Sequence, residues 1–161
     1  MKRPVIIGVM GGGRSNDRDL KDAHHLGSLI AQQGWVLLNG GRASGIMAAS
    51  AQGAAAAGGL TVGVLPDDNP AQAADDIQIP ICTGMGSARN MINVLSSRIV
   101  VACPGGPGTI SEVALALKHD RQVITLNFDL RTTFPAAFES GQLALAHSPE
   151  EVIDLIRQSI V

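Results

Sequence analysis

The sequence predicts a doubly wound α/β domain with a mainly parallel sheet of about seven strands and helices on both faces. Short β-branched and apolar runs alternate along the chain with longer Ala- and Leu-rich segments at helical spacing. The short runs lack polar alternation, which is typical of parallel strands buried on both faces. Glycines gather directly after several of these runs, at the end of the sheet where such folds bind ligands.

Seven apolar runs are predicted to be strands. Each is five or six residues long, and most are rich in Val and Ile and bounded by polar residues, glycine or proline. The last is the weakest, because its apolar residues are mostly Ala and Leu. The predicted strands are residues 5–10, 35–39, 61–65, 77–82, 99–103, 122–126 and 142–146.

Helices are predicted in the segments between these strands. Leu20 and Ile30 lie on one face of the first, together with small residues. The final helix has a complete start signal, with Ser148 as N-cap, Pro149 at the first position and Glu151 at the third. The other predicted helices are residues 45–57, 88–97 and 109–118.

Length and composition limit the possible functions. The chain has 161 residues, and we expect residues 1–161 to form one domain. A formal net charge of -2 and 2% aromatic residues argue against nucleic-acid binding. Cys82 and Cys103 form neither a CxxC pair nor a disulfide framework, and no histidine has metal-ligand spacing. No signal peptide or membrane span is recognisable, so we expect a cytoplasmic protein. Because no residues have metal-ligand spacing, we also expect that no side chain binds a metal directly.

Three glycine-rich turns follow the first, second and fifth predicted strands, and each leads into a predicted helix. Glycine lets the backbone approach an anion closely, and a helix N-terminus offers unpaired N–H groups and a partial positive charge. The turns are therefore predicted to form one anion-binding groove, although glycine in such loops also has purely structural roles. The turn residues concerned are Gly11, Gly12, Arg14, Gly40, Gly41, Arg42, Gly45, Gly105, Gly106 and Gly108.

Two familiar nucleotide motifs do not fit these turns. The segment "GVMGGGRS" departs from the P-loop because Arg14 replaces the lysine, and no predicted strand ends in an aspartate for magnesium. The dinucleotide fingerprint fails because Asn16 stands where its third glycine is needed. The second strand also ends in Asn39 rather than in an acid for a ribose. We therefore expect neither ATP nor NAD as a cofactor.

Glu112 and Arg89 each allow two interpretations, one structural and one functional. Thr109 and Glu112 have the spacing of a capping box, which would explain both residues structurally. In the first helical turn Glu112 would be ionised by the helix dipole, which suits binding a hydroxyl or stabilising a cationic centre better than general-acid work. Arg89 and Asn90 open a helix, where a cation is not favoured by the dipole. Arg89 either faces an anion or is an ordinary surface arginine.

Taken together, these motifs resemble the Lonely Guy or "lysine decarboxylase-like" superfamily of Rossmann-like proteins. The resemblance covers roughly residues 5–126 and rests on Gly40-Gly41 with Gly45-Ile46-Met47, on Arg89-Asn90, and on "PGGPGTISE" at 104–112. In the enzyme branch it implies a phosphoribohydrolase, which cleaves the N-glycosidic bond of a nucleoside 5'-monophosphate. The catalytic pair of that branch corresponds to Glu112 and Arg89.

The sequence departs from that branch at two positions. Asn90 stands where the enzymes usually have lysine, and Pro107 stands where they have an aromatic residue. The segments "TGMGSARN" and "LPDDNP" are more similar to the molybdenum cofactor carrier proteins. This second resemblance implies a homo-oligomer, a dimer or tetramer, that binds and protects the molybdopterin cofactor as cargo and is a carrier rather than an enzyme. Molybdoenzymes or cofactor-synthesis proteins are then possible partners.

The predicted cofactor-binding residues combine the three turns with the motif residues. Thr109 and Ser111 have hydroxyls that can donate hydrogen bonds to oxyanions. The cofactor brings its own sulfur ligands, so no cysteine is needed. The motif residues added to the turn residues are Met47, Arg89, Asn90, Thr109, Ser111 and Glu112.

Overall fold

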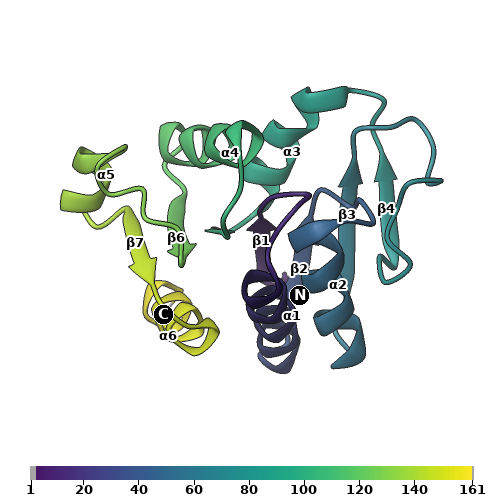
Figure 1. The fold of residues 1–161 in the computed structure, drawn as a ribbon, viewed down its shortest axis with the longest axis horizontal. Helices are drawn as coiled ribbons and strands as arrows, with labels where there is room; N and C mark the ends of the chain where they lie inside the picture. Colours follow the sequence, from purple (N-terminus) through teal and green to yellow (C-terminus); the bar gives the residue numbers. More distant parts are fainter. Residues whose placement is uncertain (1–2, 161) are drawn as a thin grey trace.

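A computed structural model describes residues 3–160 and shows a seven-stranded, all-parallel sheet of the Rossmann-like type (Figure 1). The predicted fold class is therefore confirmed. The strands lie in the order β4-β3-β2-β1-β5-β6-β7. Their bounds are β1 Ile6–Met10, β2 Val36–Asn39, β3 Thr61–Leu65, β4 Ile79–Cys82, β5 Ile99–Ala102, β6 Gln122–Leu126 and β7 Leu143–Ala146.

Six α-helices connect or follow the strands. In Figure 1, α1, α2 and α6 lie on one side of the sheet and α3 and α4 on the other, with the short α5 beside β7. Two buried apolar clusters correspond to these two faces. The helices are α1 Asp17–Gln32, α2 Gly45–Ala56, α3 Arg89–Ser96, α4 Pro107–Lys118, α5 Pro135–Glu139 and α6 Pro149–Ser159.

The strand order reverses at β1, which pairs with β2 on one side and β5 on the other. Gly8 of β1 is opposite Leu38 of β2 and Val100 of β5. Because all strands are parallel, the loops that leave β1 and β5 begin at the same edge and diverge to opposite faces. This is the switch point at which doubly wound sheets bind ligands.

The helices α1 and α2 are held unusually close together by glycine. A Cβ on Gly27 would lie 2.1 Å from the carbonyl oxygen of Ser50, and one on Gly53 would lie 1.8 Å from that of His24. No side chain fits at such distances. The two glycines thus fix the position of α2, whose N-terminus adjoins the switch point.

Several predicted boundaries differ from those observed. The strand predicted at 77–82 begins at Ile79, and Cys103 lies just beyond β5. The helix predicted at 88–97 begins at Arg89, after a single 3₁₀ turn at Gly86–Ala88. The helix predicted at 109–118 begins two residues earlier, at Pro107. The sequence analysis did not predict α5.

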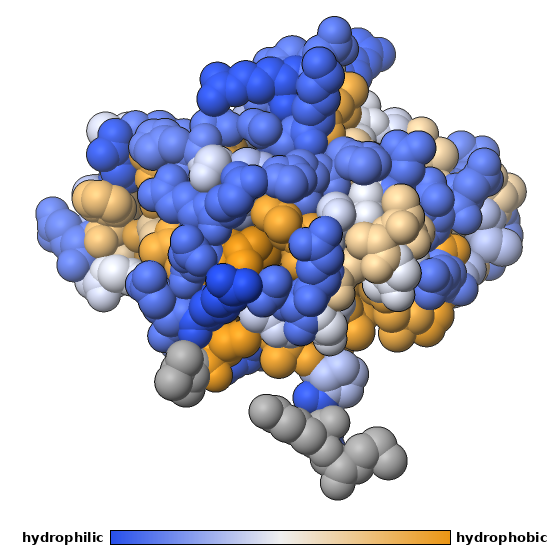
Figure 2. Space-filling model, turned by 90° about the horizontal axis from the view of Figure 1, so that it is seen from below, coloured by the Kyte–Doolittle hydropathy of each residue, from blue (hydrophilic) through white to orange (hydrophobic). Residues whose placement is uncertain are grey.

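One strand contradicts the expectation that both faces of the sheet are covered. All four residues of the edge strand β4 are exposed, including Ile79 at 44% and Ile81 at 43%. No helix extends over this edge, because α2 and α3 cover only its neighbours (Figure 1). Figure 2 shows the face formed by α1, α2 and α6 as mainly polar, with apolar patches between the polar side chains. None of the described helices is long and apolar enough to cross a membrane.

Candidate functional site

A cleft of about 280 Å³ lies at the switch point between β1 and β5. Its floor is formed by the glycine loop after β1 and the first turn of α4 after β5. The two loops are joined directly, because the Gly12 N–H donates to the Pro104 carbonyl oxygen at 3.0 Å. Gly105 lies against this contact, where a Cβ would be 2.9 Å from the Gly12 nitrogen. The junction brings backbone from two strands into one wall.

The first turn of α4 presents its amides to the cleft. The helix begins with Gly106 as N-cap, Pro107 at the first position and no side-chain cap. The N–H groups of Gly108 and Thr109 therefore have no intrahelical acceptor. A Cβ on Gly106 or Gly108 would meet open space, so a ligand can approach this backbone closely. A helix start of this kind favours a negatively charged group.

The turn after β2 contributes through Gly40 and Met47. The Asn39 side chain shapes this turn, accepting from the Gly41 N–H at 2.8 Å and donating to the Met47 carbonyl at 2.9 Å. Gly40 is in contact with the guanidinium of Arg89, since a Cβ there would lie 2.7 Å from its Nη2. Glycine at 40 therefore leaves the space in which the arginine lies.

Arg89 enters the cleft from the start of α3. It donates a hydrogen bond from Nη1 to the Asn90 side chain, while its Nε is buried and has no partner among the described residues. Burial lowers the pKa of Arg89 from its ordinary value, and the charge of Glu112 partly opposes this. An arginine remains a cation nonetheless. The Nε is thus a buried donor whose hydrogen bond is not made within residues 3–160.

Glu112 faces the same cleft from the second turn of α4 and is only 8% exposed. Its Oε2 accepts from Asn93 Nδ2 at 3.3 Å. Burial raises the pKa of Glu112 to about 7, against the opposing effects of the Asn93 hydrogen bond and the Arg89 charge. The expectation of a carboxylate ionised by the helix dipole is wrong, because desolvation dominates. A carboxyl with this pKa can both give and take a proton near neutrality.

The capping-box interpretation is also wrong. Since α4 begins at Pro107, Thr109 and Glu112 lie inside the helix, and both are buried. Neither caps its N-terminus. A partial box is found instead at α6, where Ser148 accepts from the Glu151 N–H. Glu151 accepts from the His147 N–H, one residue before the N-cap, so only the Ser148 half of the box is formed.

Most of the predicted binding residues do line this one cleft. They come from four loops and helix starts that are far apart in the sequence but adjacent at the carboxyl edge of the sheet. The predicted residues that line the cleft are Gly11, Gly12, Gly40, Met47, Arg89, Asn90, Gly106, Gly108, Thr109 and Glu112.

The remaining predicted residues lie outside it. Arg14 is exposed, and Arg42 pairs with Asp67 at 3.0 Å. Ser111 is beside the cleft, 3.4 Å from Asn90 Nδ2. The other three lie in close contacts within the fold: Gly41 against Leu65 and Gly63, Gly45 against the backbone of Gly12 and Gly13, and Gly105 against the Thr109 side chain and Gly12.

Asn93, the hydrogen-bond partner of Glu112, was not predicted from the sequence. Asn93 is fully buried in α3, one helical turn after Arg89. The signal was present, because Arg89 and Asn93 are four residues apart and share a helix face. Gly13 and Ser87, which line the cleft, were not predicted either.

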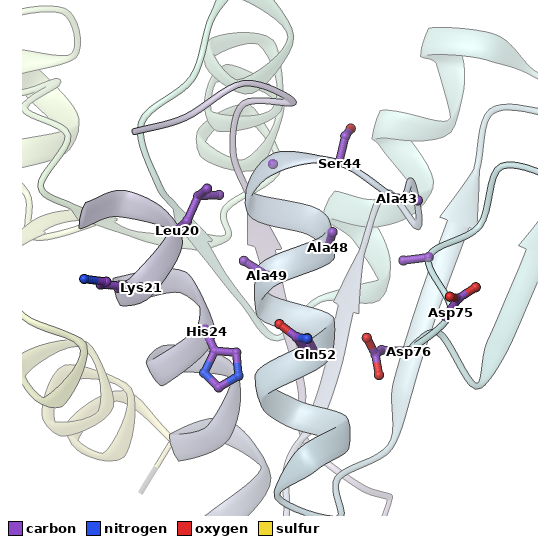
Figure 3. Close-up of a pocket in the computed structure, with 12 residues that line it drawn as sticks. Leu20, Lys21, His24, Ala43, Ser44, Ala48, Ala49, Gln52, Asp75 and Asp76 are labelled. Carbon is purple, nitrogen blue, oxygen red and sulfur yellow. The ribbon is translucent and has the colours of Figure 1, made fainter. Parts of the chain in front are cut away.

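A larger hollow of about 650 Å³ lies between α1 and α2 (Figure 3). Lys21 and His24 project from α1, the small residues Ala48 and Ala49 from α2, and Asp75 lies opposite on a loop. Of the predicted binding residues, only Gly45 lines it. It lies along the helices rather than at the strand ends, and no buried charged group faces it. The smaller cleft is therefore the candidate site.

Neither cysteine lines the cleft. Burial raises the pKa of the Cys103 thiol to about 12, so it is a neutral thiol at physiological pH. Cys82 is exposed on β4, away from the cleft. Within residues 3–160 no three His, Cys, Asp or Glu side chains are grouped so that they could hold a metal ion.

Comparison with known proteins places the chain in a family. A sequence model of the SLOG cluster4 family matches residues 4–153. The chain belongs to the SLOG cluster4 family. A protein of similar length from Archaeoglobus fulgidus, described as uncharacterised, is 40% identical over 96% of both chains.

Two solved structures resemble this SLOG cluster4 protein over almost its whole length. The molybdenum cofactor binding protein of the phototrophic bacterium Rippkaea orientalis is 51% identical, covers 100% of both chains and has a TM-score of 0.94. The molybdenum cofactor carrier protein of Chlamydomonas reinhardtii is 42% identical, covers 97% of this chain and 98% of its own, and has a TM-score of 0.88. The resemblance found in the sequence motifs is thus confirmed.

Proposed function

We propose that this protein binds molybdenum cofactor in the switch-point cleft, protects it and carries it to molybdoenzymes or cofactor-synthesis proteins in the cytoplasm. The observation that carries the proposal is the cleft itself, which joins amide-rich turns and an arginine at the edge where this fold binds ligands. Full-length similarity to two proteins named for binding or carrying this cofactor supports the choice of ligand.

The residues of the cleft fit an anionic end of such a cargo. The buried, unpartnered Nε of Arg89 is a charged donor without an acceptor. Gly106 and Gly108 leave open space above the first amides of α4. A phosphate or oxo-anion group would satisfy these donors together. Glu112 would then lie beside the bound group as the one acidic side chain among the described residues lining the cleft.

A second function, hydrolysis of a nucleoside 5'-monophosphate, is favoured by one observation. Glu112 and Arg89 line the same cleft, and the pKa of Glu112 is about 7. A carboxyl of this kind suits acid-base work at an N-glycosidic bond better than a fully ionised one. The carrier remains our first proposal because the solved structures that match the whole chain are named for cofactor binding.

Two assays separate these functions. The purified protein is incubated with molybdenum cofactor and passed through gel filtration, and the retained molybdenum and pterin are measured. In parallel it is incubated with AMP and assayed for free adenine. The carrier predicts retention and no turnover. Adenine release that disappears in Glu112→Ala would replace the carrier with the hydrolase.

Assembly is a separate part of the proposal. By its resemblance to the carrier proteins we expect a homo-oligomer, a dimer or a tetramer. Light scattering coupled to gel filtration measures the mass directly. A mass equal to one chain of 16.6 kDa at micromolar concentration would contradict this part and leave the binding proposal intact.

A further inference from the structure

Asn93 takes no part in the proposed function, yet its side chain contacts Glu112, the one acidic side chain among the described residues lining the cleft. It is 0% exposed, and its Nδ2 donates to Glu112 Oε2 at 3.3 Å. Its Oδ1 is buried and has no hydrogen-bond partner among the described residues. A buried, unsatisfied amide oxygen is costly and calls for an explanation.

An asparagine can pair with either form of a carboxyl group. In the orientation seen here its NH₂ donates to a carboxylate, and after a half-turn about its last torsion its oxygen accepts from a carboxylic acid. Glu112 therefore keeps a hydrogen bond whether it is protonated or not. Aspartate in place of Asn93 would pair with the acid alone, and leucine would pair with neither.

We propose that Asn93 is a positioning residue that keeps both protonation states of Glu112 available, so that Glu112 takes up a proton when an anion binds in the cleft. The neutral acid leaves only attractive groups around the anion. The carboxylate places a like charge in the same desolvated space and weakens binding. The balance is simple: carboxylate, anion and one proton give the carboxylic acid with the anion bound.

The inference rests on the proposed function only in treating the cleft as the site of an anionic ligand. For a carrier the coupling would link cargo binding to proton uptake and cargo release to proton loss. The binding free energy would then depend on pH through one group.

Few charged groups face Glu112. From α3 it faces Arg89, which stays cationic throughout the relevant range. Arg42 and Asp67, on the loops after β2 and β3, pair with each other and act on Arg89. The loops after β1 and β5 contribute glycine and proline, and Cys103 at the end of β5 stays a neutral thiol. Glu112 is thus the group among the described residues that titrates in the cleft near neutral pH.

The test uses sulfate as the probe, because its own charge is constant between mildly acidic and mildly basic pH. Binding is followed by the NMR shifts of the Gly106 and Gly108 amides in the intact protein. With a carboxyl pKa of about 7, affinity should be roughly thirtyfold lower at about pH 8.5 than at about pH 5.5.

Three variants assign the effect. Glu112→Gln should bind sulfate with an affinity that no longer depends on pH. Asn93→Leu should keep the dependence but move its midpoint to higher pH, because the charge-assisted hydrogen bond that the carboxylate loses is stronger than the neutral one that the acid loses. A merely structural role of Asn93 would leave the midpoint unchanged. Glu139→Gln, the same change at an exposed position on α5, should match the unaltered protein.

Four results would overturn the inference. They are pH-independent sulfate affinity in the unaltered protein, a persistent dependence in Glu112→Gln, an unmoved midpoint in folded Asn93→Leu, and no sulfate binding at all. If Asn93→Leu does not fold, the Glu112→Gln profile still decides the coupling, and direct NMR titration of Glu112 in Asn93→Ser decides the role of the asparagine. Cofactor retention without pH coupling refutes this inference alone, whereas coupling without retention refutes the carrier alone.

Discussion

Glu112 shows why a local pattern misleads at the scale of a residue. Its spacing from Thr109 matches a capping box, but Pro107 fills the first helical position and moves the helix start back by two residues. The residue then lies one turn further in, under α3, where Asn93 contacts it. The sequence motifs predicted that Glu112 and Arg89 belong to one site, and both line the cleft. The sequence could not show the burial that sets the protonation of Glu112, because burial depends on a neighbouring helix.

The stability of the protein should depend on the charge of Glu112. Its folded pKa of about 7 lies above its ordinary value of 4.5, so the folded state holds a proton that the unfolded state has already released between these values. The stability that this bound proton gives the folded state is fully present below pH 4.5, and it is lost as the pH rises to about 7. At pH well above 7 the buried carboxylate costs up to about 3 kcal/mol.

Glu112→Gln should therefore stabilise the protein at alkaline pH and have little effect at acidic pH. Urea unfolding at about pH 5 and about pH 8.5 measures both free energies of unfolding. The difference between variant and unaltered protein isolates this group from all others that titrate. A variant that is less stable at the higher pH would show that the carboxylate is not destabilising.

Gly106→Val tests whether a ligand approaches the backbone at the first turn of α4. Gly106 has an extended backbone with φ at -96°, which valine adopts easily, and a side chain there would enter open space in the cleft. We expect a melting temperature within about 3 °C of the unaltered protein, together with loss of cofactor retention. Ala114→Val adds similar bulk on an exposed position of the same helix and should retain the cofactor. Retention by a folded Gly106→Val would mean that no ligand approaches this turn.

At the scale of elements, the sequence predicted the bounds of a strand best where residues that break a strand flank its apolar run. The strands β3 and β6 have the predicted bounds, since their apolar runs end in clear breakers. The helix α5 was not predicted because a five-residue helix has too little periodicity to detect. The exposure of β4 was not predicted either, because an edge strand and a central strand of a parallel sheet have the same composition. Which strand stays uncovered depends on where the helices lie over the sheet (Figure 1).

Gly53→Ala should destabilise the protein, although helix propensity alone predicts a gain of about 1 kcal/mol. The new Cβ would lie 1.8 Å from the His24 carbonyl oxygen, so α1 and α2 must move apart. We expect a loss of at least about 2 kcal/mol in the free energy of unfolding, measured with urea. Gln52→Ala, at the neighbouring exposed position on α2, should change it by less than about 0.5 kcal/mol. A stabilised Gly53→Ala would mean that the helices are not in close contact.

At the scale of the whole molecule the strand order creates the site. The glycine-rich turns are visible in the sequence, and because the predicted sheet is parallel, these turns were expected at one edge of it. The sequence could not predict that β1 and β5 are neighbours, which is what joins Gly12 to Pro104 and forms the cleft between them. It also could not show that Gly41 and Gly45 pack against backbone while Gly40 faces the arginine. Those differences depend on the path of each loop in three dimensions.

Hydrogen exchange of the whole chain can decide whether the cofactor binds in the switch-point cleft or in the hollow between α1 and α2. A ligand in the switch-point cleft contacts loops from β1 and β5 and the start of α3 at once, so exchange in segments 11–13, 87–90 and 106–109 should slow together when molybdenum cofactor is added. The loop at 74–76, which lines the hollow between α1 and α2, should exchange at its original rate. Gly106→Val should abolish the protection in all three segments, since they share one ligand. Protection confined to 43–45 and 74–76 would instead move the binding site to the hollow between α1 and α2, and the arginine and carboxyl of the cleft would then need another explanation.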